Sequence, residues 1–275
     1  MLSVLLCAAA LADPPVSAGY RLVDAGHDLD APVALLVLTP GVGEAAYQPL
    51  VSALEAVGLD AWTVAVTPSA PLPAEDADRW VADRLLPEAV ASLRAREPRA
   101  AALALVGHGP GGTLALMAAP RVAPAAVAVL GAPLGPIPSA ALQDLAARPL
   151  PEAGCVDLAQ PVDWRGHDLA TLLLGAPSLP LEPLPVPMAR AYLRWIAEGP
   201  PLEPANLVFP IFVGVAALDH LVPVETVHRS AGNLPDATFA RFGLLRLDLY
   251  DPEHADLLRD RRFMDEVARW VRERI

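Results

Sequence analysis

The amino-acid sequence predicts an α/β fold with a mostly parallel, doubly wound sheet and an inserted, mostly helical segment. Short apolar runs alternate with stretches of helical periodicity up to residue 132, the alternation then stops, and it resumes at residue 207. Alternating strands and helices give parallel sheets with right-handed crossovers. We therefore expect a core of residues 13–132 and 207–275, interrupted by residues 133–206.

The first half of the chain supplies the strands and helices of this pattern in order. Continuous apolar runs are typical of strands that are buried on both faces, and they lie at 33–38, 61–66, 101–106 and 126–130. Apolar residues at helical spacing predict helices at 47–54, around 86–93 and at 113–119. Pro87 is expected to kink the second of these helices.

The second half contains the insertion and the end of the sheet. Residues 133–206 hold 14 of the 31 prolines and no clear strand, which favours an irregular and helical segment. The strand pattern returns at 207–215 and 239–249. A final helix is expected to bury Phe263, Val267, Trp270 and Val271 on one side.

Composition excludes several classes of protein. Hydrophobic residues make up 54% of 275 residues, which is enough for a sizeable core. A net charge of −12 disfavours binding to nucleic acid. No stretch of apolar residues reaches the length of a transmembrane helix. The spacing of the histidines does not suggest a metal site at His167, His220 or His228. No cofactor is expected. Nothing in the sequence indicates an oligomeric state.

Residues 1–12 are almost entirely apolar and end in Ala10-Leu11-Ala12, a pattern typical of a signal-peptide cleavage site. A signal peptide predicts a periplasmic or extracellular protein, and otherwise the protein is cytoplasmic. The segment lacks a basic residue after Met1, so a misplaced start codon or an apolar tail are the alternatives. A lipid anchor at Cys7 is disfavoured by Leu6. Cleavage would leave Cys155 as the one cysteine, so no disulfide forms within the chain.

A glycine-rich turn, Gly107 to Gly112, lies between a predicted strand and a predicted helix. Its spacing satisfies G-x-G-x-x-G, which binds a dinucleotide when it follows the first strand and an acidic residue lies about 20 positions later. This turn follows the third predicted strand, and no acidic residue occurs between Glu97 and Asp144. Dinucleotide binding is therefore the weaker of two interpretations.

The same turn also fits G-x-S-x-G, the nucleophile elbow, with Gly109 in place of serine. The stretch LVGHGPGGTLALMAA (residues 105–119) resembles, residue by residue, the elbow of α/β-hydrolases. The segment LLVLTPGVG (35–43) is similar to the early strand and oxyanion loop of that family, with Thr39-Pro40-Gly41 where His-Gly is usual. This resemblance places the oxyanion loop at Gly41 and Val42, with Pro110 after the nucleophile position.

Two later loops carry the resemblance to the end of the chain. VGVAALDHLVPVE (213–225) looks like the loop of the catalytic acid, which implies Asp219, although the spacing from Gly214 is longer than usual. LDLYDPEHADLL (247–258) looks like the loop of the catalytic histidine, which implies His254. The order elbow, acid, histidine is the order of the family. The insertion, 133–206, stands where these enzymes carry a lid.

Each site residue also has a purely structural interpretation. Asp219 is compatible with a turn aspartate ahead of a helix, and His254 with a capping or surface histidine. Together and in this order, the two residues favour the family interpretation. His108 is a frequent neighbour in this elbow and is expected to pack locally.

The departures from the family pattern affect the chemistry directly. Gly109 has no side chain, so no acyl-enzyme can form there. Pro110 has no N–H, whereas the residue after the nucleophile normally supplies an oxyanion donor. The sequence therefore predicts an inactive α/β-hydrolase-like protein that binds a small apolar, ester-like or lipid ligand. The alternatives are a hydrolase of esters or lipids that uses Asp219, His254 and water, and a dinucleotide-binding protein.

Cys155 and Ser139 are disfavoured as substitute nucleophiles, because nothing places either near His254.

Overall fold

The structure is a computed structural model. The structure describes residues 19–25, 31–67, 70–137, 150–152, 154–156, 181–217, 219, 222–242, 258 and 260–275. The predicted signal peptide, Ser139, His167, His220 and His254 lie outside these residues, as does half of the insertion.

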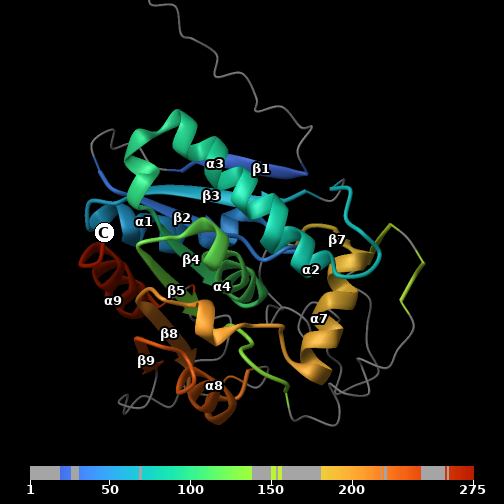
Figure 1. The fold of residues 1–275 in the computed structure, drawn as a ribbon. Coiled ribbons are helices and arrows are strands. Elements are labelled where there is room, and N and C mark those ends of the chain that lie inside the picture. Colours follow the sequence, from blue (N-terminus) through green and yellow to red (C-terminus); the bar gives the residue numbers. More distant parts are fainter. Residues whose placement is uncertain are drawn as a thin grey trace, which may run out of the picture.

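A seven-stranded sheet forms the centre of the molecule, in the order β1-β3-β2-β4-β5-β8-β9 (Figure 1). Six strands are parallel, and β1 pairs antiparallel with β3 at one edge. The strands of the sheet are β1 Tyr20–Asp24, β2 Val33–Val37, β3 Asp60–Val66, β4 Ala104–His108, β5 Ala126–Leu130, β8 Ile211–Ala216 and β9 Ala237–Phe242. The mostly parallel sheet predicted from the sequence is thus confirmed.

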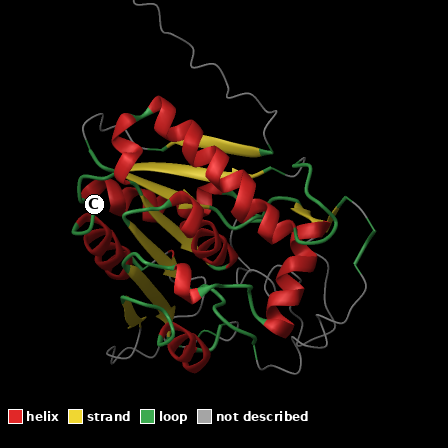
Figure 2. Ribbon diagram, viewed as in Figure 1, coloured by secondary structure: helices red, strands yellow, loops and turns green. Residues whose placement is uncertain are grey.

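Helices cover both faces of this sheet (Figure 2). The helix pair α1 and α9 packs together, and α3 packs on α4. The α-helices are α1 Gln48–Ala56, α2 Ala77–Trp80, α3 Leu86–Arg96, α4 Pro110–Val122, α7 Val186–Glu198, α8 Val224–Ala231 and α9 Arg261–Arg272. Shorter turns are η2 Glu44–Tyr47, the π-helical η3 Val81–Leu85, η4 Pro98–Ala102 and η5 Pro204–Asn206. The described helices include none that is long and apolar enough to cross a membrane.

The core follows the predicted hydrophobic pattern. Strands β2, β4 and β5 are buried along their whole length, as expected for strands covered on both faces. Helix α9 buries Phe263, Val267, Trp270 and Val271, the four residues predicted to form its apolar side. Its first turn is capped by Asp260, whose Oδ1 accepts hydrogen bonds from the N–H groups of Arg262 and Phe263 at 2.9 and 3.1 Å.

Several element boundaries differ from the prediction. The strand expected at 101–106 begins only at Ala104, because residues 98–102 form the turn η4. In that turn Arg99 is ion-paired with Glu97 at 2.8 Å and with Asp60 at 3.3 Å. The expected kink at Pro87 is instead a π-helical turn, η3, just ahead of the proline. Proline clashes with the carbonyl four residues earlier, and widening the helix there relieves that contact.

The end of the sheet and the insertion also depart from prediction. The strand expected at 207–215 is β8, Ile211–Ala216, and the described part of the last strand, β9, begins at Ala237. The insertion contains a pair of two-residue strands that the sequence did not indicate, β6 Cys155–Val156 and β7 Leu184–Pro185. Helix α7 is the described helical part of the insertion.

A buried carboxylate anchors helix α7 to the core. Asp78 on α2 has an exposed fraction of 0%. It accepts hydrogen bonds from Arg194 Nη2 at 2.6 Å and from Trp195 Nε1 at 2.7 Å, and both donors lie on α7. Bonds to a charged group are about twice as strong as neutral ones, so Asp78 is expected to hold α7 in place.

The substitution Asp78→Asn tests this anchor. Asparagine keeps the shape but offers one acceptor oxygen, so one donor on α7 loses its partner. We expect a loss of about 2 kcal/mol in the free energy of unfolding, measured by urea denaturation with Trp fluorescence. The matched control is Asp76→Asn, because Asp76 lies 3.6 Å from the same arginine but is 62% exposed; its effect should stay below about 0.5 kcal/mol. Equal effects of the two substitutions would contradict the anchor.

Candidate functional site

The glycine-rich turn connects β4 to α4 at the carboxyl edge of the sheet. Gly109 adopts φ 52° and ψ −135°, a conformation that costs a residue with a side chain about 1–3 kcal/mol. Its N–H donates to the carbonyl of Leu130 at 2.8 Å, which ties the turn to β5. A sharp, strained strand-to-helix bend of this kind is the geometry of a nucleophile elbow.

The glycines around Gly109 are required by close backbone contacts. A Cβ at Gly107 would lie 2.6 Å from the N of Gly112, and a Cβ at Gly112 would lie 2.9 Å from the carbonyl oxygen of Gly107. A Cβ at Gly111 would contact the end of β2, 2.9 Å from the N of Thr39. Helix α4 can therefore start against β2 and β4 only because these positions lack side chains.

Thr39 connects the end of β2 to both sides of the elbow. Its Oγ1 donates to the carbonyl of His108 at 2.5 Å and accepts from the N–H of Gly111 at 3.2 Å. The N–H groups of Gly112 and Thr113 both bond to the carbonyl of Gly109, at 3.0 and 3.3 Å. Since Pro110 has no N–H, each of the first N–H groups of α4 is already paired within the chain.

The predicted oxyanion loop is shaped by its own turn and by the insertion. The N–H of Val42 donates to the carbonyl of Thr39 at 3.0 Å, so it is engaged in that turn. The carbonyl of Gly41 accepts from the N–H of Glu182 at 3.0 Å, and Val42 forms an antiparallel bridge with Leu181. Within the described part of the chain, the N–H of Gly41 makes no hydrogen bond.

A buried tyrosine supports the same loop. The hydroxyl oxygen of Tyr47, in η2, accepts from the N–H of Thr39 at 3.0 Å. Burial raises the pKa of Tyr47 to about 12, against the smaller lowering effect of its contacts with Thr39. Tyr192 on α7 is also buried, and burial raises its pKa well above the usual value, with smaller contributions from Tyr47 and Asp78. Its hydroxyl has no hydrogen-bond partner among the described residues.

Asp219 lies at the same edge of the sheet, after β8. It is 5% exposed, and its Oδ1 accepts from the N–H of Val222 at 2.7 Å, just before α8. This hydrogen bond fits the structural interpretation of Asp219 as a turn aspartate ahead of a helix. The pairing of Asp219 with His254 stays a prediction, because His254 lies outside the described residues. Among those residues, no group of three or more His, Cys, Asp or Glu side chains is arranged to hold a metal.

The sequence matches no family model and no curated protein sequence. Solved structures do match it. A lipase-esterase related protein from Clostridium acetobutylicum is 15% identical with a TM-score of 0.64, over 94% of this chain and 100% of that chain. An enol-lactonase from Burkholderia xenovorans is 16% identical with a TM-score of 0.60, over 92% and 95%. An α/β-hydrolase enzyme from a lagoon-sediment metagenome is 11% identical with a TM-score of 0.52, over 93% and 95%.

This chain has the α/β-hydrolase fold. The resemblance seen in the sequence is thus confirmed at the level of the fold. In an α/β-hydrolase sheet the sequence order elbow, acid loop, histidine loop brings the three to one edge, because all follow parallel strands. Gly109 follows β4 and Asp219 follows β8, with one strand, β5, between them. The segment that contains His254 follows β9.

The elbow of this α/β-hydrolase fold is visible in the sequence, but the side chain that completes it is not. Thr39 was noted as a departure from His-Gly, and the partners of its hydroxyl were not predicted. A hydroxyl residue directly after a buried strand, in a chain with Pro110 at the elbow, is the signal that could have pointed to it. Tyr192 and Asp78 gave no signal, because their surroundings come from distant parts of the chain.

The substitution Thr39→Val tests the bridge between β2 and the elbow. Valine keeps the shape but leaves the carbonyl of His108 and the N–H of Gly111 buried without these partners. We expect the free energy of unfolding to fall by about 2 kcal/mol. Thr39→Ser keeps the hydroxyl and should lose clearly less, and urea denaturation measures both. A valine variant as stable as the serine variant would show that the hydroxyl contributes nothing.

Proposed function

We propose that this protein is a non-catalytic member of the α/β-hydrolase fold that binds a small apolar or ester-like ligand beneath helix α7. One observation carries the proposal. The elbow has the strained backbone of a nucleophile position, and it holds Gly109 followed by Pro110. The position therefore has neither a hydroxyl to attack an ester nor the N–H that normally follows it.

The surroundings of the elbow support the same conclusion. The next N–H, that of Gly111, bonds to Thr39 Oγ1, and Val42 N–H is engaged in its own turn. An oxyanion hole needs donors that point at the developing charge. A phosphate at the start of α4 would need the same N–H groups, so their internal pairing also speaks against dinucleotide binding through this turn.

The ligand-binding part of the proposal is supported by Tyr192. Its hydroxyl is a buried donor without a partner among the described residues, and a buried donor is stabilised by an acceptor. It lies on α7, within the insertion that the sequence resemblance aligns with a lid. An ester or carbonyl oxygen is the type of acceptor that matches a phenol donor inside an apolar site.

Hydrolysis of short and medium acyl nitrophenyl esters tests the proposal. The full-length protein is compared with His254→Ala and with the control His228→Ala, which removes an exposed histidine on α8. We expect no turnover above buffer in any of the three. Turnover that is lost in His254→Ala and kept in His228→Ala would show a working hydrolase that uses Asp219, His254 and water, and would overturn the proposal.

A further inference from the structure

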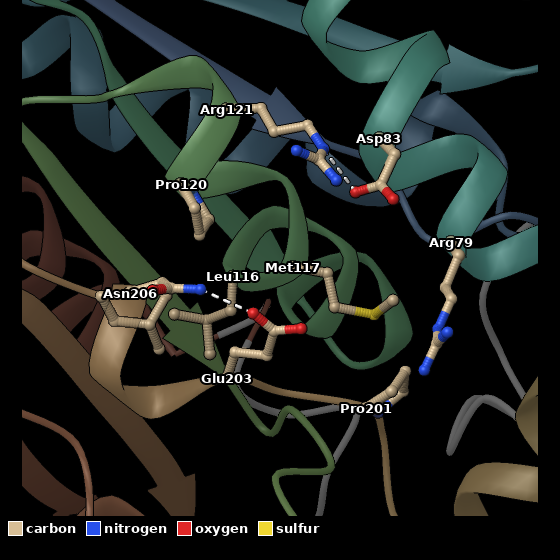
Figure 3. Close-up of a pocket in the computed structure, with 10 residues that line it drawn as sticks. Arg79, Asp83, Leu116, Met117, Pro120, Arg121, Pro201, Glu203 and Asn206 are labelled. Carbon is tan, nitrogen blue, oxygen red and sulfur yellow. Dashed lines mark hydrogen bonds and ion pairs between the residues drawn. The ribbon is translucent and has the colours of Figure 1, made fainter.

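A concave site lies beside the second half of α4, away from the elbow. Its volume is about 290 Å³, and it is enclosed by α2 and η3, by the second half of α4 and by the connection before β8 (Figure 3). The elbow precedes the first residue of α4, whereas Pro120 and Arg121 of the pocket lie near its last residue. This volume is near the lower limit of small-molecule pockets, about 300 Å³.

Two polar pairs form opposite walls of this pocket. On one wall, Arg121 Nε donates to Asp83 Oδ1 at 2.7 Å, which balances both charges. On the other, Asn206 Nδ2 donates to Glu203 Oε2 at 2.6 Å. Asn206 is neutral, so Glu203 keeps its negative charge. The carboxylate of Asp83 raises the pKa of Arg121, and the charge of Glu203 adds a smaller effect in the same direction. Both carboxylates therefore lie near the same guanidinium.

Arg79 supplies a positive charge to the pocket, apart from the two polar pairs. It makes no ion pair or hydrogen bond within the part of the chain that the structure describes. Figure 3 shows its guanidinium beside Pro201, with the Met117 side chain between it and Glu203. The pocket therefore presents a positive and a negative group on either side of an apolar floor.

The floor between these groups is apolar. Leu116, Met117 and Pro120 of α4 line it, and apolar side chains of a ligand would pack there.

We infer that the pocket binds a dipeptide-sized zwitterion, with its carboxylate at Arg79, its ammonium at Glu203 and its apolar side chains on Leu116 and Met117. The two charged ends of an extended dipeptide are separated by about 7 Å. A simple carboxylate would place no cation beside the charge of Glu203, and a simple amine would place no anion beside Arg79. This inference does not depend on the state of the elbow.

Titration of the full-length protein with Ala-Leu, followed by NMR or calorimetry, tests the inference. N-acetyl-Ala-Leu lacks the ammonium and Ala-Leu-amide lacks the carboxylate. We expect saturable binding of Ala-Leu and about fivefold weaker binding of each blocked peptide, the effect of one partly exposed ion pair.

Variants assign each end of the peptide. Arg79→Gln should weaken the binding of Ala-Leu about fivefold and leave the binding of Ala-Leu-amide unchanged. Glu203→Gln should weaken the binding of Ala-Leu and of Ala-Leu-amide and leave the binding of N-acetyl-Ala-Leu unchanged. Arg96→Gln and Glu88→Gln make the same changes of net charge at exposed positions of α3 and should leave all affinities unchanged. No saturable binding of Ala-Leu, equal binding of the blocked peptides, or equal effects of the control variants would each overturn the inference.

Discussion

The double substitution Gly109→Ser with Pro110→Ala is expected to give this protein measurable ester hydrolysis. The serine restores a nucleophile at the elbow, and alanine restores the N–H that proline removes. One oxyanion donor contributes about 10²–10³-fold to the rate, so the double variant should exceed Gly109→Ser alone by about that factor. The rate constants for nitrophenyl ester hydrolysis measure this difference.

Two controls make this result specific. Pro110→Ala alone has no nucleophile and should stay inactive, and adding His254→Ala to the double variant should abolish the new turnover. Equal rates for the single and double serine variants would mean that the N–H at position 110 has no role. No turnover in the double variant would mean that Asp219 and His254 do not form a working pair with this elbow.

The serine should also reduce stability. Gly109 sits at φ 52° and ψ −135°, where a side chain costs about 1–3 kcal/mol. The glycine at this position therefore favours stability over catalysis. Assays of the serine variants should be run well below their midpoint of thermal unfolding, so that lost folding is not read as lost activity.

The largest loss of stability is expected for Gly111→Ala. The new methyl group would meet the carbonyl oxygen of Val37, and would lie 2.9 Å from the N of Thr39 and 3.0 Å from the carbonyl carbon of Leu38. All three are backbone atoms of the β2 end and cannot rotate away. We expect a loss of about 3 kcal/mol or more in the free energy of unfolding, measured by urea denaturation.

Gly232→Ala is the matched control, because it adds the same methyl group in an uncrowded place. Gly232 has φ −62°, and a Cβ there would have its nearest contacts at 3.4 and 3.6 Å. Alanine at such a position is neutral or stabilises by up to about 1 kcal/mol through the unfolded state. A Gly111→Ala variant as stable as this control would mean that α4 does not start against β2.

The central strands of the fold could be predicted from sequence because their pattern is local. Val33–Val37 and Ala126–Leu130 are continuous apolar runs, and burial on both faces requires such runs. Strand β1, Tyr20–Asp24, could not be predicted in this way, because it is an edge strand in which Leu22 alone of the five residues is buried. The turn η4 was read as strand because its alanines are apolar, whereas the ion pairs of Arg99 depend on Asp60, which is distant in sequence.

The candidate site shows the same contrast between local patterns and contacts of residues that are distant in sequence. Gly109 and Pro110 could be identified from spacing alone, since the elbow is a short local motif. The Thr39 hydroxyl could not, because its partners lie 69 and 72 residues away. The contact of Gly41 with Glu182 joins the oxyanion loop to the insertion, and no periodicity in either segment predicts it.

We propose that the elbow of this α/β-hydrolase fold holds no covalent nucleophile, because Gly109 has no side chain. Incubation of the full-length protein with a fluorophosphonate, followed by intact-mass and peptide mass spectrometry, tests it most directly. We expect no adduct on the natural chain and one adduct, at position 109, on the Gly109→Ser/Pro110→Ala variant. An adduct on any serine or on Cys155 of the natural chain that disappears in His254→Ala would instead show that the protein has a working nucleophile activated by His254.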